Sequence, residues 1–161
     1  MSCGWTLRNR FTTMFWVQKK VHWSDTDAAG IVWFPNFFGW FEDAEEELYV
    51  AALGRTRQSV LDSLGFAMPR VEAHAKYHAP VRPATVIRIG IRSTIENPRR
   101  MRHDFEMRFT SGDLIASGFV RVASVDLSTF APRDFPDEIR TFAEALPKAA
   151  ANQSTEDLPW V

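Results

Sequence analysis

The chain has 161 residues, enough for one domain by the guide of ~100–200 residues per domain. Hydrophobic residues make up 45% of it, including 13 Phe and 6 Trp, which excludes the disordered and fibrous classes. The net charge of −1 argues against a protein that binds nucleic acid or an anionic membrane by bulk electrostatics. A single cysteine, Cys3, excludes an internal disulfide and a multi-thiolate zinc site.

The first predicted elements are a strand and a long helix joined by a polar loop. Apolar and polar residues alternate over 14–23, the period-two pattern of a half-buried strand. Turn-forming residues follow over 24–30. From 34 to 52 the apolar residues recur every three or four positions, which predicts an amphipathic helix that ends at Gly54. A shorter helix is predicted over 56–64.

The second half of the chain is predicted to be mainly strands. Alternating patterns cover 70–79, 84–95, 101–110 and 113–126. Turn residues separate the last three, so we expect an antiparallel meander. A helix is predicted over 135–146, which completes a single domain of residues 1–147, and residues 148–161 have the composition of a polar tail.

This order of elements predicts an α+β fold, with an antiparallel five-stranded sheet wrapped around the long helix. One helix covers only one face of a sheet. We therefore expect another subunit to close the remaining edge or face.

The loop and the start of the long helix carry a distinctive motif. It runs Asp25-Thr26-Asp27-Ala28-Ala29-Gly30-Ile31-Val32-Trp33-Phe34-Pro35-Asn36-Phe37 and is followed by Trp40-Phe41-Glu42. The motif resembles the signature of the 4-hydroxybenzoyl-CoA thioesterase family of hot-dog proteins, and the strand order extends the resemblance over residues 14–146. The resemblance implies a hot-dog fold and an acyl-CoA thioesterase that acts as a homodimer or homotetramer, with its sites at subunit interfaces.

The resemblance also assigns roles within the motif. It makes Asp27 the catalytic carboxylate, and it makes the backbone N–H of Phe34 the donor that polarises the thioester carbonyl. We expect Gly30, Trp33 and Phe37 to contribute to the substrate pocket. The chemistry fits these residue types, because a thioester has a good leaving group and needs only a carboxylate and donors for the oxyanion. The sequence leaves open whether Asp27 acts as nucleophile or as general base.

Acidic residues have plainer interpretations as well. The aspartates of the motif are typical turn and capping residues, and we assign that role to Asp25 rather than Asp27. Glu42 lies at the edge of the apolar stripe of the helix and Glu45 lies near its middle, so both are candidate desolvated acids. We keep Glu42 as a catalytic candidate beside Asp27, with Glu45 as an alternative. A structural ion pair with an arginine is the competing interpretation for both glutamates.

Three arginines, Arg99, Arg100 and Arg102, cluster at a predicted turn. Their forked guanidinium groups suit the phosphates of coenzyme A, and the family often holds the nucleotide on this hairpin. The competing interpretation is a solvated turn. We expect no metal and no cofactor, since His74 and His78 are four residues apart on a strand, too far for easy shared coordination.

Together these features predict hydrolysis of an aromatic or short-chain acyl-CoA. Two alternatives remain open: a non-catalytic module that binds acyl-CoA, and a hot-dog hydratase or dehydratase, which would need an Asp/His pair that the motif lacks. Residues 1–10 lack the apolar stretch of a signal peptide, and the chain has no run of ~18 apolar residues for a membrane span. We therefore expect a cytoplasmic enzyme with no nucleic-acid or membrane partner.

Overall fold

The architecture is seen in a computed structural model, which describes residues 14–151, 153–154 and 156–161. Cys3 and the start of the predicted domain therefore lie outside the described residues. The described helices include none that is both long and apolar enough to cross a membrane.

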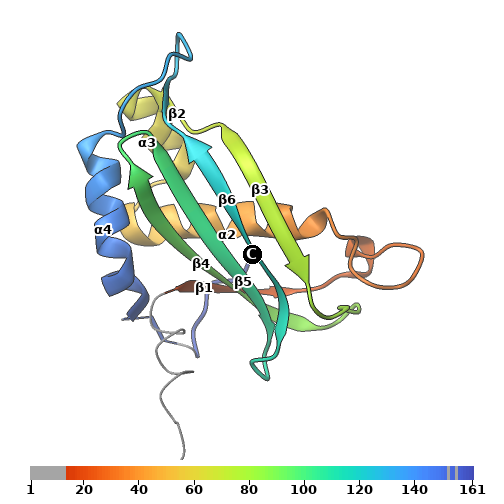
Figure 1. Ribbon diagram of the computed structural model, residues 1–161. Coiled ribbons are helices and arrows are strands. Elements are labelled where there is room, and N and C mark those ends of the chain that lie inside the picture. Colours follow the sequence, from red (N-terminus) through yellow and green to blue (C-terminus); the bar gives the residue numbers. More distant parts are fainter. Residues whose placement is uncertain (1–13, 152, 155) are drawn as a thin grey trace, which may run out of the picture.

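A five-stranded antiparallel sheet forms the body of the molecule (Figure 1). Its strands follow the order β1-β4-β5-β6-β3, and each neighbouring pair is antiparallel. They comprise β1 (Phe15–Lys20), β3 (Arg70–Tyr77), β4 (Val86–Asn97), β5 (Arg100–Phe109) and β6 (Leu114–Ala123). A separate short pair joins β2 (Phe66–Ala67) to β7 (Val125–Asp126).

The predicted meander is correct only for β4, β5 and β6. The structure corrects the position of β3, which pairs with β6 at one edge, while β1 pairs with β4 at the other. Tight turns join β4 to β5 and β5 to β6, so those strands become neighbours. The connection after β3 instead contains Pro80 and Pro83, which suit an extended crossing better than a two-residue hairpin.

The long helix α2 (Asn36–Leu53) lies across one face of the sheet, behind it in the view of Figure 1. Its apolar stripe supplies the helix side of the core, and alternate residues of the central strands supply the other side. The buried residues include Phe37, Trp40, Phe41, Ala44 and Leu48 from α2, with Ile87, Ile89, Ile91, Phe105 and Met107 from the sheet. The predicted α+β architecture, with a five-stranded sheet around a long helix, is therefore confirmed.

Two further helices flank this core. The short helix α3 (Arg57–Leu64) begins at Thr56, whose hydroxyl accepts the N–H of Ser59 at 3.2 Å and so caps the helix. The helix α4 (Asp137–Ala151) packs along β4 and β1 and runs five residues beyond its predicted end.

The polar tail predicted from residue 148 is also corrected. After α4 the chain returns along β1, where Gln18 donates its N–H to the carbonyl of Pro159 at 2.8 Å and accepts the N–H of Val161 at 3.0 Å. Leu158 is buried against Met14 and Trp16. The edge of β1 offered unpaired backbone groups that this segment satisfies.

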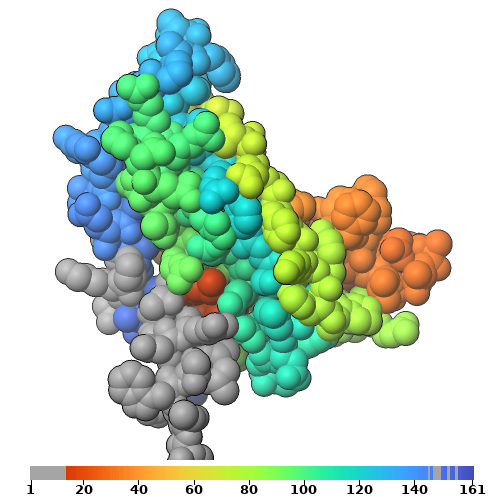
Figure 2. All heavy atoms as spheres, in the orientation of Figure 1, coloured from red at the N-terminus to blue at the C-terminus, as the bar shows by residue number. Residues whose placement is uncertain are grey.

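The other edge of the sheet, along β3, has no such cover among the described residues. Nearly every side chain of β3 is exposed. Figure 2 shows β3 in yellow-green along one side of the molecule, with the orange segment that leads into α2 projecting beyond it. The open edge and the loop before α2 therefore lie on the same side of the molecule.

Candidate active site

The loop between β1 and α2 is organised by Asp25. Its carboxylate accepts the N–H of His22 at 2.7 Å. Its carbonyl accepts both the N–H of Trp33 at 2.9 Å and the side-chain amide of Asn36 at 2.8 Å. Asp25 thus joins the beginning of the loop to the start of the helix, as predicted for a residue that shapes the turn.

Asp27 lies in a tight turn inside this loop. Its N–H donates to the carbonyl of Ile31 at 2.9 Å, its carbonyl accepts the N–H of Gly30 at 3.0 Å, and Oδ1 accepts the N–H of Ala29 at 2.8 Å. Gly30 has a φ of 71°, which a side chain would strain, so the turn requires glycine at this point. The second carboxylate oxygen of Asp27 accepts no hydrogen bond from the described part of the chain, and the side chain is exposed.

The backbone next to the helix start leaves one amide without a partner. Trp33 and Asn36 donate their N–H groups within the loop and first turn, and Pro35 has none. Over the residues that the structure describes, the N–H of Phe34 donates to no acceptor. Pro35 precedes the first helical residue and provides no side-chain cap, so the positive end of the helix dipole is uncompensated here.

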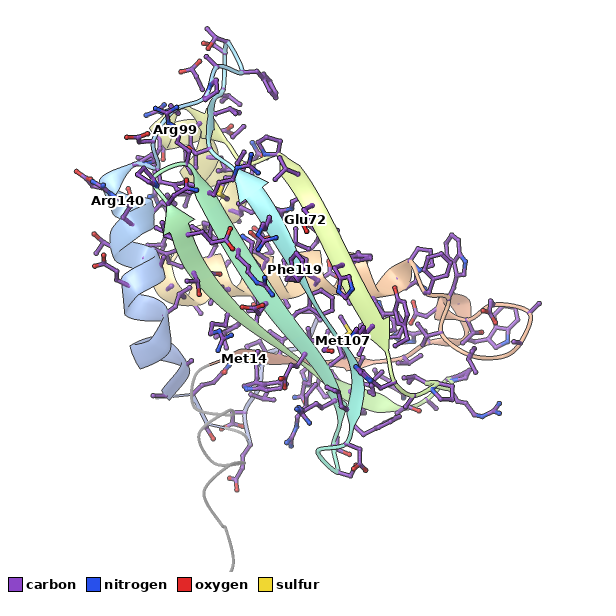
Figure 3. The ribbon with its side chains drawn as sticks, in the orientation of Figure 1. Met14, Glu72, Arg99, Met107, Phe119 and Arg140 are labelled. Carbon is purple, nitrogen blue, oxygen red and sulfur yellow. The ribbon has the colours of Figure 1, made fainter. Side chains whose placement is uncertain are left out.

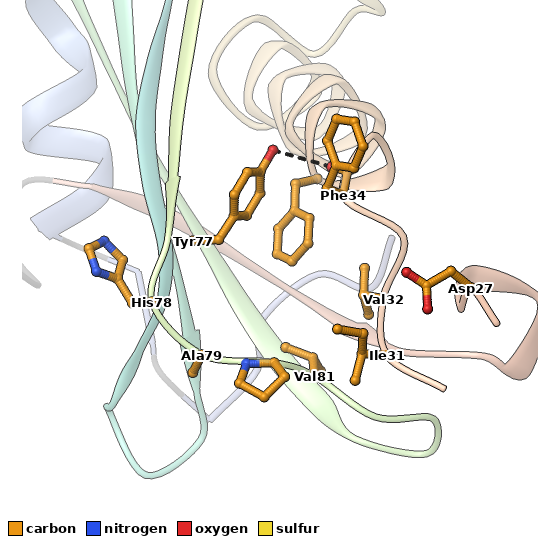
Figure 4. Close-up of a pocket in the computed structure, with 10 residues that line it drawn as sticks. Asp27, Ile31, Val32, Phe34, Tyr77, His78, Ala79 and Val81 are labelled. Carbon is orange, nitrogen blue, oxygen red and sulfur yellow. Dashed lines mark hydrogen bonds between the residues drawn. The ribbon is translucent and has the colours of Figure 1, made fainter. Parts of the chain in front are cut away.

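A cavity of about 430 Å³ lies against these groups (Figure 4). Its wall is mostly apolar and is formed by the loop, the start of α2 and the end of β3. The lining residues are Asp27, Ile31, Val32, Phe34, Phe37, Tyr77, His78, Ala79, Pro80 and Val81. The carboxylate and the unpaired amide that the sequence predicted to act together therefore border one cavity.

Aromatic side chains form the wall opposite Asp27. The ring of Tyr77 lies 5.1 Å from that of Phe37 and 6.3 Å from that of Phe34, in both cases edge to face. The Tyr77 hydroxyl donates to the carbonyl of Phe34 at 3.4 Å. Burial raises the pKa of this hydroxyl, so it remains a donor at neutral pH. Phe34 is nevertheless 60% exposed and Tyr77 45% exposed, which leaves this side of the cavity open.

The end of β3 contributes to the cavity, although no residue there is among the site residues predicted from the sequence. Tyr77 lies in the series of alternate apolar residues along its strand. That alternation was the sequence signal that its ring would face the helix. His78 has the opposite parity. Figure 4 shows its ring turned away from Phe34, and its Nε2 lies 3.0 Å from the hydroxyl of Ser117.

The remaining residues of the motif that were predicted to form the substrate pocket do not all lie in the same cavity. Phe37 is buried and lines the cavity. Trp33 is not among the lining residues; it is half exposed and lies edge-on to Phe34, at 6.5 Å between ring centroids. Gly30 lines a second cavity, which Asp27 also borders.

Glu42 lies on α2 away from this cavity and is held in ion pairs. It contacts Arg57 at 2.8 Å and Arg70 at 2.9 Å. Burial by itself would raise the pKa of Glu42, but the charges and hydrogen bonds of Arg70 and Arg57 outweigh it and leave the pKa below its usual value. The structure does not bring Glu42 and Asp27 into one pocket.

Glu45 belongs to the same cluster and is fully buried. It pairs with Arg57 at 2.6 Å and with Arg70, and its Oε1 lies 3.5 Å from Nε2 of His103. Ser93 completes the group, with its hydroxyl 2.8 Å from Nδ1 of His103. The ion-pair interpretation therefore accounts for the contacts of both glutamates.

The three arginines at the β4–β5 turn lie at the other end of the molecule from Asp27. Figure 3 places Arg99 at the end of the sheet beside α4, opposite the projecting orange loop. Arg99 pairs with Asp134 at 2.8 Å, Arg102 pairs with Asp104 at 2.8 Å, and Arg100 is exposed. Within one chain these arginines and Asp27 do not form a common site.

The chain is similar in sequence to a known protein family and to individual thioester-hydrolysing proteins. The model of the Thioesterase-like superfamily matches residues 21–143. A 1,4-dihydroxy-2-naphthoyl-CoA hydrolase of Synechococcus sp. (strain CC9605) is 29% identical over 141 residues, which cover 83% of this chain and 93% of the relative. A 4-hydroxybenzoyl-CoA thioesterase of Pseudomonas sp. (strain CBS-3) is 32% identical over 62 residues, which cover 38% of this chain and 44% of the relative.

A solved structure shows the same fold. The crystal structure of Slr0204, a 1,4-dihydroxy-2-naphthoyl-CoA thioesterase from Synechocystis, matches with a TM-score of 0.74 at 23% identity and covers 81% of this chain and 95% of that chain. The predicted hot-dog fold is confirmed by this likeness and by the family match.

Proposed function

Because this chain belongs to the Thioesterase-like superfamily, we propose that it hydrolyses the thioester of an aromatic acyl-CoA to the free acid and coenzyme A. The predicted enzyme class, a thioester hydrolase, is confirmed by relatives that are named as hydrolases and thioesterases. The observation that carries the proposal is the cavity of about 430 Å³ that both Asp27 and Phe34 border.

The proposed reaction uses these two groups in different ways. The unpaired N–H of Phe34, at the positive end of α2, donates a hydrogen bond to the carbonyl oxygen and stabilises the negative charge that develops on it. Asp27 either attacks the carbonyl carbon, forming an anhydride that water then opens, or takes a proton from the attacking water. In both routes the carbon–sulfur bond breaks and the thiolate, from a thiol with a pKa of ~8.5, leaves without a general acid.

The acyl group is proposed from the lining of the cavity and from the relatives. Phe34, Phe37 and Tyr77 form an aromatic wall that suits a flat ring system. The Synechococcus hydrolase aligns with most of this chain, whereas the 4-hydroxybenzoyl-CoA thioesterase aligns with 38% of it. We therefore rank 1,4-dihydroxy-2-naphthoyl-CoA before 4-hydroxybenzoyl-CoA as the substrate to test.

The enzyme is further proposed to act as a homodimer or homotetramer. The β3 edge is unpaired over the described residues, and it ends at Tyr77, in the open side of the cavity. A second copy paired along β3 would close that side. In such a pair, we expect the arginines of the β4–β5 turn of one copy to approach the active site of the other copy.

Substitution of Asp27 by Asn tests the proposal. The side chain keeps its size but loses the negative charge, so we expect a folded protein whose release of thiol from 1,4-dihydroxy-2-naphthoyl-CoA falls by at least ~10²-fold. Asp43→Asn is the matched control, because Asp43 is an exposed carboxylate on α2 outside the cavity. We expect Asp43→Asn to retain wild-type turnover.

Two results would contradict the proposal. If Asp27→Asn turned over the thioester at the wild-type rate, Asp27 would not be the catalytic carboxylate. If the wild-type protein bound acyl-CoA but released no thiol from any thioester tested, the chain would be a binding module instead of a hydrolase.

A further inference from the structure

The cavity beside Asp27 has few polar side chains in its wall. Among the described residues that line it, only Asp27, Tyr77 and His78 carry a polar group on the side chain. The others are Ile31, Val32, Phe34, Phe37, Ala79, Pro80 and Val81. A cavity of this kind orients its ligand through its few polar groups, so these groups decide which acyl groups are preferred.

Two of the three polar side chains do not serve the acyl group. Asp27 is assigned to the reaction at the thioester carbonyl. The ring of His78 turns away from Phe34 in Figure 4, and its Nε2 lies 3.0 Å from the hydroxyl of Ser117. The hydroxyl of Tyr77 is therefore the polar side-chain group of this wall that remains for recognition of the acyl group.

Tyr77 lies where the acyl ring is expected to reach. Figure 4 shows Tyr77 and Asp27 on opposite sides of Phe34. The ring of Tyr77 is 5.1 Å from that of Phe37, so the two rings form one continuous aromatic surface. An acyl ring that packs on Phe37, with its thioester between Asp27 and the N–H of Phe34, extends toward the Tyr77 hydroxyl.

The fold fixes the position of Tyr77. Its backbone pairs with Ala116 of β6, and the next residue, His78, donates its N–H to the carbonyl of Ile115 at 2.8 Å. Its ring packs edge to face on Phe37 and Phe34. A side chain held by both its strand and its neighbours can report the position of a single ligand atom.

The hydrogen bonds of the Tyr77 hydroxyl define the chemical group that it can bind. A phenol has one proton to donate and lone pairs that accept. Its proton is directed to the carbonyl of Phe34, at 3.4 Å, and burial raises the pKa of the hydroxyl, so the proton is retained at neutral pH. Over the residues that the structure describes, no group donates to the Tyr77 oxygen. The oxygen is therefore available as an acceptor, and its partner must be a donor.

We propose that Tyr77 determines specificity for acyl groups whose ring carries a hydroxyl, and that this hydroxyl donates its proton to the Tyr77 oxygen. The inference rests on the proposed function and narrows it from aromatic to phenolic acyl-CoAs. A methoxy group has no proton to donate, and an unsubstituted ring has no polar group at all. Both leave the Tyr77 oxygen without a partner, so both are poorer substrates. Tyr77 takes no part in bond breaking.

The test compares three acyl-CoAs that share one ring system: 1,4-dihydroxy-2-naphthoyl-CoA, its dimethoxy analogue and 2-naphthoyl-CoA. Tyr77→Phe removes the hydroxyl and keeps the aromatic ring. For this variant we expect kcat/KM for the dihydroxy substrate to fall about 3-fold to 10-fold, the loss typical of one neutral hydrogen bond. The kcat/KM values for the other two acyl-CoAs stay within about twofold. A purely structural role of Tyr77 would lower all three values together.

The chain offers a matched control at its other tyrosine. Tyr49→Phe makes the same change in the core, where the hydroxyl of Tyr49 contacts Sδ of Met68 at 3.9 Å. We expect Tyr49→Phe to discriminate among the three acyl-CoAs as the wild type does. If Tyr77→Phe lowered kcat/KM equally for all three acyl-CoAs, or for none of them, the inference would be wrong.

Binding of the free acids, measured by titration calorimetry, separates this inference from the proposed function. The probes are 1,4-dihydroxy-2-naphthoic acid and 2-naphthoic acid. If no thioester is hydrolysed but Tyr77→Phe weakens the binding of the dihydroxy acid alone, the proposed reaction fails and the inference stands. If the wild type binds the dihydroxy acid no more tightly than 2-naphthoic acid, the inference is wrong, whether or not thioesters are hydrolysed.

Discussion

Glu45 shows how one buried carboxylate ties several elements together. It lies on the buried face of α2, pairs with Arg57 of α3 and Arg70 of β3, and faces His103 of β5. A buried charge is tolerated only when it is paired, and removal of one partner typically costs about 3–5 kcal/mol. The cluster holds α2 in place against the sheet, and so supports the helix start beside Asp27.

His103, which is fully buried in this cluster, makes stability depend on pH. Burial lowers the pKa of His103 below its usual value, and the charge of Glu45 only partly opposes this. The unfolded chain therefore binds the additional proton first as pH falls below ~6.5, and the free energy of unfolding drops by up to about 1.36 kcal/mol per pH unit. We expect His103→Gln to lose this slope in urea unfolding between about pH 6.5 and about pH 5.

This pH window separates His103 from Glu42. The pKa of Glu42 is lowered from its ordinary value of 4.5. The stabilising contribution of Glu42 is therefore lost only as the pH falls below about 4.5, which lies under the interval in which His103 acts. His74→Gln is the control, because His74 is exposed on the outer face of β3. Equal slopes for wild type and His103→Gln would contradict the assignment.

At the scale of elements, the C-terminal segment protects one edge of the sheet. The side-chain amide of Gln153 accepts the N–H of Trp16 at 2.7 Å and donates to the carbonyl of the same residue at 2.7 Å. One amide side chain thus occupies the place of a neighbouring strand. Together with the backbone contacts of Gln18 to the last residues, it leaves β1 closed to pairing with another chain.

Gln153→Ala removes both of these hydrogen bonds. At about 0.5–1.5 kcal/mol each, their loss lowers the free energy of unfolding by about 1–3 kcal/mol. Urea denaturation at neutral pH measures the change. Gln58→Ala is the matched control, since Gln58 is exposed on α3 and its side-chain amide donates to Asp62. Its effect is expected to stay within about 0.5 kcal/mol. Equal stabilities of the two variants would show that the amide contributes nothing to the edge.

At the scale of the whole molecule, the open β3 edge is the surface available to a second copy. His78 donates its N–H to the carbonyl of Ile115 at 2.8 Å, so even-numbered residues of β3 direct their backbone groups toward β6. Ala73 therefore directs its N–H away from the sheet, into the free edge. Proline at such a position keeps the internal ladder intact.

We expect Ala73→Pro to convert the proposed oligomer to a monomer. Proline removes the outward N–H and blocks pairing along β3, while β3 still pairs with β6. Size-exclusion chromatography with light scattering gives the mass. Ala73→Gly is the control, because glycine also weakens a strand but retains the N–H. An oligomer that survived Ala73→Pro would show that the copies associate through another surface.

The sequence by itself determined the local features of this protein. Period-two alternation placed the five main strands, the aromatic stripe placed α2, and the motif placed Asp27 and Gly30 in one turn before the helix. These features depend on residues that are neighbours in the chain. For that reason their signals are complete within a short window of sequence.

Only the tertiary structure decided which distant segments meet. In the folded chain β3 pairs with β6, the arginine turn lies far from Asp27, and the C-terminal segment lies along β1. The tertiary structure also brings the Tyr77 hydroxyl to the carbonyl of Phe34 and encloses Glu45 with its arginines. Each of these contacts joins elements that lie far apart in the chain. The contacts stabilise the protein only when the whole sheet closes around α2. For that reason no local sequence pattern predicts them.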